Sequence, residues 1–456
     1  MLGYLRRLTI RNLVSPYGLA LFSYAVFLFA WTFPPSIYTS YINEPDLMFL
    51  DPLTFVFYTS CVALFLIGVR SCRYLGVSTK EPPLARISTR MPIVYLAIPL
   101  LLATALCSVY LILFGEKINF VAMLISQQGQ EIKTASESGK LSSGAIWEIL
   151  LSPPVSLAAV LWWACFRASQ LKMRGTGKFV YYAIFFFAFS VDIITCIAKV
   201  DRTTLMPLIL GLLVIYFYRQ SRAENVRLTS LLGIGVASIA GVVATFFLFS
   251  FLRGASILRL LVMAVLGYTI TSYNRMAALL GGSMHYLYGG KGLYLSSFLS
   301  GGNWLNRFLG LGYLLGWPTS RQLWDSEFFS TAGAGLNPGF IWSGVFGYLY
   351  SDVGWWTLLY LFFAGLWAGY LWLGFKQGRM ISVILYLWMA FWVLFWLGWN
   401  LLLDLKMFTM LEAGIMLALY DRAFIRNWKE DHKSLCGQMP TLRSSGRIAR
   451  LQRVDN

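Results

Sequence analysis

The residues best suited to chemistry in this sequence are basic side chains that lie between long apolar runs. The planar guanidinium of arginine pairs with two phosphate oxygens at once, and it stabilises negative charge that develops on a departing phosphate. The basic residues at or between the ends of apolar runs in the centre of the chain include Lys199, Arg202, Arg253, Arg259, Arg275 and Lys291. Their density in so apolar a chain predicts a site for an anionic ligand, such as a lipid diphosphate headgroup.

His285 is a candidate for a catalytic base. An unperturbed histidine has a pKa of about 6.5 and can act as a general base toward a hydroxyl group. It stands in a glycine- and tyrosine-rich stretch, and the same long segment also holds Asn337 and Asp352. Each candidate has a plain alternative. Arg202 and Arg253, at the ends of apolar runs, also suit snorkelling to lipid headgroups, and His285 also suits a surface position among tyrosines.

The same residue types give no pattern for a metal site. The sequence holds 6 cysteines without a Cys-x-x-Cys pair, 2 distant histidines and no Asp-x-Asp motif. Zinc sites and disulfide frameworks need closely spaced cysteine and histidine ligands. We therefore expect neither a metal nor a cofactor.

The elements that position these residues are membrane-spanning helices. The chain of 456 residues is 58% hydrophobic and 12% charged, whereas soluble domains are about 25% charged. Each span needs roughly 20 apolar residues. About ten such runs are present, and a range of 10–12 is open; they lie near 14–33, 52–69, 92–114, 146–166, 179–198, 203–218, 228–252, 354–375, 381–400 and 401–420. The expected fold class is an all-α polytopic membrane protein.

Basic residues alternate between successive loops in the way that sets membrane orientation. Lysine and arginine favour cytoplasmic loops, and most of the 37 basic residues fall in every second loop if both chain ends are cytoplasmic. The net charge of +17 is therefore a topological signal and not a sign of nucleic-acid binding. The first run follows a basic end without a cleavage pattern and predicts an uncleaved helix.

One loop is far longer than the others and predicts the division of the chain. Residues 1–252 form an N-terminal bundle of seven spans, 253–353 an outer loop or lid, 354–421 three further spans, and 422–456 a basic cytoplasmic tail that also suits anionic lipid headgroups. Within the loop, 256–280 is amphiphilic and predicts an interfacial helix, while 339–350 is too short to span and is expected to pack back into the bundle. A loop this apolar and aromatic is expected to fold.

Two acidic residues lie well inside predicted spans, away from the ends of the runs. Asp192 lies in the run 179–198, and Glu412 lies in the run 401–420. Intramembrane carboxylates are functional candidates, and pairing with a neighbouring helix is the structural alternative.

Several short motifs between 199 and 370 resemble the Wzy-type O-antigen polymerases, also called oligosaccharide repeat unit polymerases. They are KVDR at 199–202, FLRG at 251–254, YNR at 273–275, NPGF at 337–340, GYLYSDVG at 347–354 and GLWAG at 365–369. The related O-antigen ligases share this layout, and His285 followed by Gly289 and Gly290 is similar to them.

The resemblance implies a metal-independent glycosyltransferase with a GT-C-like bundle in the bacterial inner membrane and an active site that faces the periplasm. It would transfer the growing glycan from undecaprenyl diphosphate to the terminal hydroxyl of another lipid-linked repeat unit. Arg202, Arg253 and Arg275 would stabilise the diphosphate, and His285 or Asp352 would activate the hydroxyl. The wider substrate-binding set would include Lys199, Arg259, Lys291 and Asn337. A chain-length regulator and a flippase are the implied protein partners.

A polysaccharide flippase or other transporter is the main rival function. Transporters often show related halves and a charged site at the membrane midplane. This sequence shows no internal repeat, and its charges gather at one predicted mouth. These features favour an enzyme.

Overall fold

The structure is a computed structural model that describes residues 11–75, 92–115, 152–171, 175–199, 202–221, 266–296, 314–318 and 320–437. This part of the chain contains helices and turns and no strand. The α-helices are α2 (Pro16–Trp31), α3 (Pro35–Ile42), α4 (Pro52–Ser71), α5 (Val94–Gly115), α9 (Pro153–Gln170), α10 (Thr176–Ala198), α11 (Arg202–Ser221), α14 (Ile270–Leu280), α17 (Ser320–Gly333), α18 (Gly344–Val353), α19 (Thr357–Lys376), α20 (Met380–Leu394) and α21 (Leu405–Gly437). Short 3₁₀ turns, η1 (Cys72–Leu75) and η3 (Gly354–Trp356), follow α4 and precede α19.

Within these residues, 5 helical segments are long and apolar enough to cross a membrane: Pro52–Tyr74, Val94–Leu113, Thr176–Ala198, Thr204–Ser221 and Gly344–Lys376. A sixth arises if α2 and α3, which meet at an angle of 87°, form one broken span. Large apolar side chains are exposed on α10, among them Phe179, Phe186 and Phe187, as expected for a helix surface that faces lipid. These features define a helical membrane protein.

Helices α2 and α4 begin where the sequence supplies a capping side chain followed by proline. Asp51 accepts from the backbone N–H groups of Leu53 (3.0 Å) and Thr54 (3.2 Å), and Pro52 follows it. Ser15 accepts from the N–H of Gly18 at 3.4 Å in the same way. An oxygen acceptor before the first turn satisfies donors that the helix leaves open, and proline suits the first helical position.

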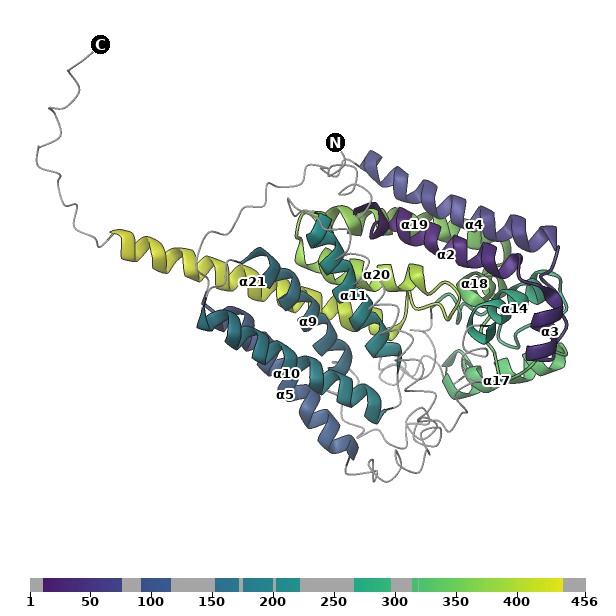
Figure 1. Cartoon of the computed structure of the whole chain (residues 1–456), viewed down its shortest axis with the longest axis horizontal. Helices are drawn as coiled ribbons and strands as arrows, with labels where there is room; N and C mark the ends of the chain where they lie inside the picture. The colour runs from purple at the N-terminus through teal and green to yellow at the C-terminus, as the bar shows by residue number, and fades with distance from the viewer. Residues whose placement is uncertain are drawn as a thin grey trace, which may run out of the picture.

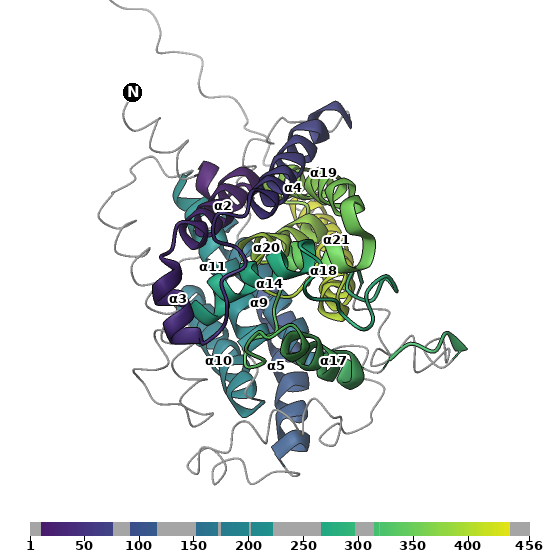
Figure 2. The same cartoon turned by 90° about the vertical axis from the view of Figure 1, so that its right-hand side faces the viewer.

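Helix α20 is the centre of the bundle and lies between the other long helices in both views (Figures 1 and 2). It packs against α2, α9, α11, α19 and α21. Every residue from Ser382 to Val393 is buried, including Trp388 and Trp392. A helix that is apolar on all sides is enclosed by its neighbours, as this one is.

Two groups of helices flank this centre. Helices α5, α9 and α10 pack together with α11, while α14 and α18 pack on each other near α2, α4 and α17 at the opposite side of Figure 1. Helices α4 and α19 make the most extensive helix pair.

The described helices coincide with nine of the ten predicted runs, and the run at 228–252 lies outside the described residues. Two boundaries differ. The run predicted at 381–400 ends its helix at Leu394, and 395–404 is a buried, non-helical connection. Helix α21 continues to Gly437, well into the region predicted as a tail. Charged helix-forming residues such as Arg422, Lys429 and Glu430 extend a helix once the apolar span has nucleated it.

The amphiphilic segment predicted over 256–280 differs from expectation in its described part. All eleven residues of α14 are buried, so this helix is enclosed by protein and does not lie on a surface with one face exposed. Its polar residues are directed at partners within the protein. The short apolar stretch predicted at 339–350 forms most of α18 and packs on α14 and α19.

Candidate functional site

The first part of the candidate site is a buried ion pair between Arg275 of α14 and Glu44, which lies between α3 and α4. The Nη1 atom of Arg275 donates to Glu44 Oε1 at 3.0 Å, and Nη2 donates to Oε2 at 2.9 Å. Both side chains are 0% exposed. The same guanidinium donates to the carbonyl oxygens of Thr271 (3.0 Å) and Asn337 (2.8 Å). Its Nε is buried and has no hydrogen-bond partner among the described residues.

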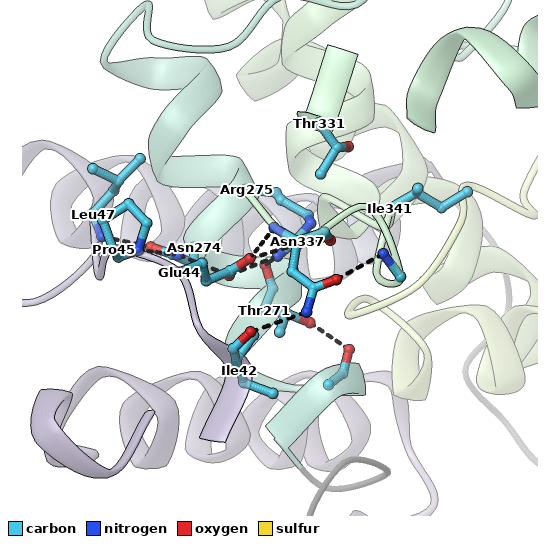
Figure 3. Close-up of polar contacts among 12 residues, drawn as sticks. Ile42, Glu44, Pro45, Leu47, Thr271, Asn274, Arg275, Thr331, Asn337 and Ile341 are labelled. Atoms are coloured by element: carbon cyan, nitrogen blue, oxygen red, sulfur yellow. Dashed lines mark hydrogen bonds and ion pairs between the residues drawn. The ribbon is translucent and has the colours of Figure 1, made fainter. Parts of the chain in front are cut away.

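Three further donors converge on the Glu44 carboxylate, and two of them, Asn274 and Asn337, are labelled in Figure 3. The backbone N–H of Asn337 donates to Oε2 at 2.7 Å, Asn274 Nδ2 donates to Oε1 at 3.2 Å, and the Tyr38 hydroxyl also donates to Oε1. We call Tyr38, Glu44, Asn274, Arg275 and Asn337 the Glu44 network. A buried charge is tolerated when it is paired and hydrogen-bonded, and this one is both.

The Glu44 network joins three segments that are distant in sequence. Asn274 accepts from the N–H of Leu47 at 2.6 Å and donates to the Pro45 carbonyl at 2.9 Å. Asn337 donates to the Ile42 carbonyl at 2.9 Å, and its Oδ1 accepts from Gly339 N–H at 2.9 Å. The α3–α4 connection, α14 and the turn before α18 are therefore held in one arrangement. Burial raises the pKa of Asp46, two residues beyond Glu44, against the effect of its bonds to Met48 and Phe49.

The second part is the segment 281–296, which we call the His285 loop. His285 and Lys291 are exposed on it, and the Lys291 ammonium lies 5.0 Å from the centroid of the Tyr288 ring. Gly290 and Gly292 have φ values of 79° and 74°, a region that glycine adopts without strain. A Cβ at Gly289 would lie 2.8 Å from the Ser351 carbonyl oxygen, so the loop lies directly on the end of α18.

Asp352 and Asn400 fix this loop through its backbone. Asp352 Oδ2 accepts from the N–H groups of Tyr294 (2.6 Å) and Leu295 (2.7 Å). Asn400 Nδ2 donates to the carbonyls of the same two residues at 3.0 and 3.1 Å, while its Oδ1 accepts from Trp392 Nε1 at 3.0 Å. The loop is thus bonded to α18 on one side and to the buried connection 395–404 on the other. Its exposed side chains start from a fixed backbone.

A cluster of aromatic rings and one acid lies beneath the loop. The rings of Tyr286, Tyr294 and Tyr348 lie 5.1 to 5.4 Å apart by centroid, and Trp399 lies 4.7 Å from Tyr348. Glu327 of α17 accepts from the Tyr348 hydroxyl at 2.8 Å, and its buried Oε1 has no hydrogen-bond partner within the described part of the chain. Burial raises the pKa of Glu327 well above its usual value. This acid is suited to holding a proton inside the cluster.

The structure brings some of the sequence-predicted residues together and separates others. Arg275 contacts Asn337 within the Glu44 network, and Asp352 supports the loop that displays His285 and Lys291. Lys199 ends α10 with its ammonium 5.2 Å from the Tyr110 ring centroid, among α5, α9 and α11 and away from α14. Arg202 is the first residue of α11, and its side chain is not among those that the structure describes. Arg253 and Arg259 lie outside the described residues.

Accessibility decides what these groups can do chemically. The Arg275 guanidinium is bonded to Glu44 through both terminal nitrogens, so another anion could reach it only if that pair opened. His285 is exposed and could accept a proton from a bound hydroxyl without rearrangement. In the described part of the chain, no group of three or more His, Cys, Asp or Glu side chains could hold a metal ion.

Sequence reasoning missed Glu44, Tyr38, Glu327 and Asn400. A signal existed for Glu44, because it lies in the short polar stretch NEPD at 43–46 between two apolar runs, at the same predicted depth as Arg275. Asn274 was inside the YNR motif and was not assigned a role. The sequence gives no sign of the bonds that Glu327 makes to Tyr348, 21 residues away, or that Asn400 makes to Tyr294, 106 residues away.

Comparison with known proteins adds no relative. No protein-family model, no curated protein and no solved structure matches the chain.

Proposed function

We propose that this protein is a polymerase of lipid-linked oligosaccharide repeat units in the bacterial inner membrane. The single observation that carries the proposal is the His285 loop: an exposed histidine and an exposed lysine on a glycine-rich backbone that Asp352 and Asn400 fix at one end of a membrane helix bundle. A fixed base beside a cation suits transfer of a group from a phosphate leaving group to a hydroxyl.

The proposed reaction is a metal-independent glycosyl transfer. His285 accepts the proton of the terminal hydroxyl of one lipid-linked repeat unit. The hydroxyl oxygen then bonds to the anomeric carbon of the glycan held on a second carrier. The bond from that carbon to the diphosphate breaks, and undecaprenyl diphosphate leaves with the electron pair. Lys291, with Arg202, Arg253 and Arg259, stabilises the charge on the leaving group.

Two observations guide the roles that we propose for these residues. Asp352 has an oxygen that accepts two N–H groups of the loop, and this use favours His285 over Asp352 as the base. Arg275 and Asn337 belong to the Glu44 network, so in the closed arrangement they position the outer segment. They would bind substrate only after Arg275 separates from Glu44.

The proposal includes a topology of ten spans, with both ends cytoplasmic, a GT-C-like bundle and the His285 loop in the periplasm. The alternation of basic loops supports this orientation. A chain-length regulator and a flippase are the proposed partners, and membrane lipid surrounds the bundle.

The test is the glycan chain-length ladder from cells that lack the gene and carry wild-type, His285→Ala or Arg253→Ala protein at matched membrane levels. Ser283→Ala, two residues before His285 in the same exposed loop, is the matched control. We expect the deletion and both site variants to leave single repeat units, while the control restores the ladder.

Other outcomes of this experiment favour the rival functions. Loss of even the single-unit product attached to its final acceptor would favour a ligase or a flippase. A normal ladder from both site variants would contradict the assignment of His285 and Arg253.

A further inference from the structure

Asp192 is an acidic residue that lies within a helix long and apolar enough to span a membrane. It lies on α10, six residues before the end of that helix, within one of the segments apolar enough to cross a membrane. Its side chain is 0% exposed, and both carboxylate oxygens are buried without a hydrogen-bond partner in the part of the chain that the structure describes. The sequence left open a pairing with a neighbouring helix, and the described helices supply no such pair.

The polar groups next to Asp192 on its own helix are committed elsewhere. Thr195, one turn further along, donates to the Val191 carbonyl at 2.8 Å. Its Oγ1 also lies 3.5 Å from the Cys107 thiol of α5. Buried apolar residues close to Asp192 along the helix include Ala188 and Val191, and the buried Cys196 thiol lies one turn further on.

Among the described side chains on the helices that pack against α10, the charged groups are directed to other partners or lie far along the helix, while the Cys107 thiol of α5 interacts electrostatically with Asp192. The side chain of Arg202, at the start of α11, lies outside the described residues. On α5, Cys107 contacts Thr195, and Tyr110 lies under the Lys199 ammonium. On α9, Arg167 is paired with Asp421, while on α11 Arg219 lies two residues from the helix end. Lys199 is seven residues beyond Asp192, about 10 Å along a helix. The structure therefore describes no cation that would neutralise this carboxylate.

An ionised carboxylate without partners is strongly disfavoured inside a membrane bundle, and a bound proton is the smallest ligand that removes the charge. We propose that Asp192 is a proton-binding site in the membrane, held as the neutral carboxylic acid between α10, α5 and α9. The inference is independent of the polymerase proposal, since it rests on a different group of helices.

A buried neutral carboxyl has a diagnostic reaction with hydrophobic carbodiimides. The acid proton moves to a carbodiimide nitrogen while a carboxyl oxygen bonds to the central carbon. The resulting O-acylisourea rearranges to a stable N-acylurea, and no atom is lost. A carboxyl group in water has a pKa of about 4 and is ionised at pH 8. At this pH, reaction with a hydrophobic carbodiimide therefore distinguishes a buried neutral carboxylic acid from a carboxylate in water.

The experiment treats the full-length protein in detergent micelles at pH 8 with dicyclohexylcarbodiimide, and in parallel with a water-soluble carbodiimide. The tryptic peptide 179–199 contains Asp192 as its sole acidic side chain, so an adduct on it identifies the site by mass spectrometry. We expect this peptide to be modified by the hydrophobic reagent and not by the water-soluble one. Asp192→Asn should lose the adduct.

The wild-type measurement decides the inference even if Asp192→Asn fails to fold. An unmodified 179–199 peptide in a sample where the Glu412 peptide is modified would overturn the proposal, as would equal modification by both reagents. An adduct that persists in a folded Asp192→Asn protein would place the reaction on another group, such as Cys196, and would also overturn it. Asp192→Glu, which keeps the carboxyl, should retain the adduct.

Discussion

The Glu44–Arg275 pair shows how much one residue can determine in this protein. The carboxylate receives hydrogen bonds from four residues that come from three separate segments, and neither charge meets solvent. Removing one member of a buried pair leaves the other charge unpaired, which usually costs about 3–5 kcal/mol. Removing both members leaves a cavity but no charge.

We therefore predict that Glu44→Ala and Arg275→Met each lower the free energy of unfolding by about 3–5 kcal/mol, with a smaller combined effect than their sum. Thermal unfolding in detergent, followed by tryptophan fluorescence, provides the double-mutant comparison. Asp46→Asn, two residues away, is the control, because it removes a half-buried charge while it keeps the side-chain oxygen that accepts from the Met48 and Phe49 N–H groups. Additive losses in the double variant would show that the two charges do not depend on each other.

Glu327 gives a pH-dependent prediction. Burial raises its pKa in the folded protein, so the folded state holds a proton that the unfolded state releases above its ordinary pKa. The stability contribution is fully present below the unfolded pKa of about 4.3 and declines as pH rises toward the folded value. Thermal stability should fall with rising pH in wild type, and Glu327→Gln should reduce this slope. An unchanged slope in Glu327→Gln would assign the dependence to other groups.

Sequence reasoning at the residue scale was limited by distance. Arg275, Asn337, Asp352 and His285 could be singled out because arginine, asparagine, aspartate and histidine are unusual in an apolar chain. Their partners could not be identified, because Glu44 is 231 residues before Arg275 and only the folded bundle brings them together. An arginine at a predicted membrane mouth is compatible with a ligand and with an internal carboxylate alike. The choice depends on the tertiary fold.

At the scale of elements, α4 and α19 show the closest backbone approach. A Cβ at Gly365 would lie 2.1 Å from the Phe65 carbonyl oxygen, and one at Gly369 would lie 2.8 Å from the Val69 carbonyl oxygen. From the first contact to the second, the residue number rises by four in both helices, so α4 and α19 run parallel. Two glycines spaced by four positions let membrane helices approach closely.

Gly365→Leu should therefore force these helices apart and destabilise the protein by about 3 kcal/mol or more, at or above the upper end of the range for overpacking. Thermal unfolding and the yield of monodisperse protein measure the effect. Gly177→Leu is the matched control, because nothing lies within 4 Å of a Cβ built there. Equal losses in both variants would show that the loss does not come from the contact between α19 and α4.

Hydropathy located most elements but not their ends or their environment. The apolar runs predicted α4, α5, α10 and α19 well, because a span must be apolar over its whole length. The connection 395–404 was read as part of two spans, since Trp396, Leu401 and Leu402 are as apolar as a helix interior. Within the connection, Asn400 accepts from the Leu402 N–H at 3.4 Å, and the carbonyls of Leu401 and Trp396 accept from Trp388 Nε1 (3.0 Å) and the Val345 N–H (2.8 Å). Non-helical backbone inside a membrane bundle is tolerated where protein provides its partners in this way.

At the scale of the whole molecule, we infer the orientation of the protein across the membrane from the charges of its loops. Lysine and arginine in short loops are the residues that distinguish the two membrane faces. Lys376 and Arg379 between α19 and α20 mark one face, and the His285 loop lies beyond the opposite end of α19, beside α18. The ten-span topology predicts that these two positions are on opposite sides of the membrane.

This topology predicts opposite labelling of two single cysteines in intact cells. His285→Cys should react with a membrane-impermeant maleimide once the outer membrane is permeabilised, whereas Gln377→Cys should react only after the inner membrane is disrupted. Cys436 is replaced by serine in both variants, and the five other cysteines are buried or half-buried free thiols. Glu412, which lies partly exposed within α21, should stay unreactive as Glu412→Cys on both sides, because maleimides need a thiolate in water. If 285 and 377 were labelled from the same side, the number of spans between them would be even. The basic loops after α4 and α19 would then not report a common cytoplasmic face.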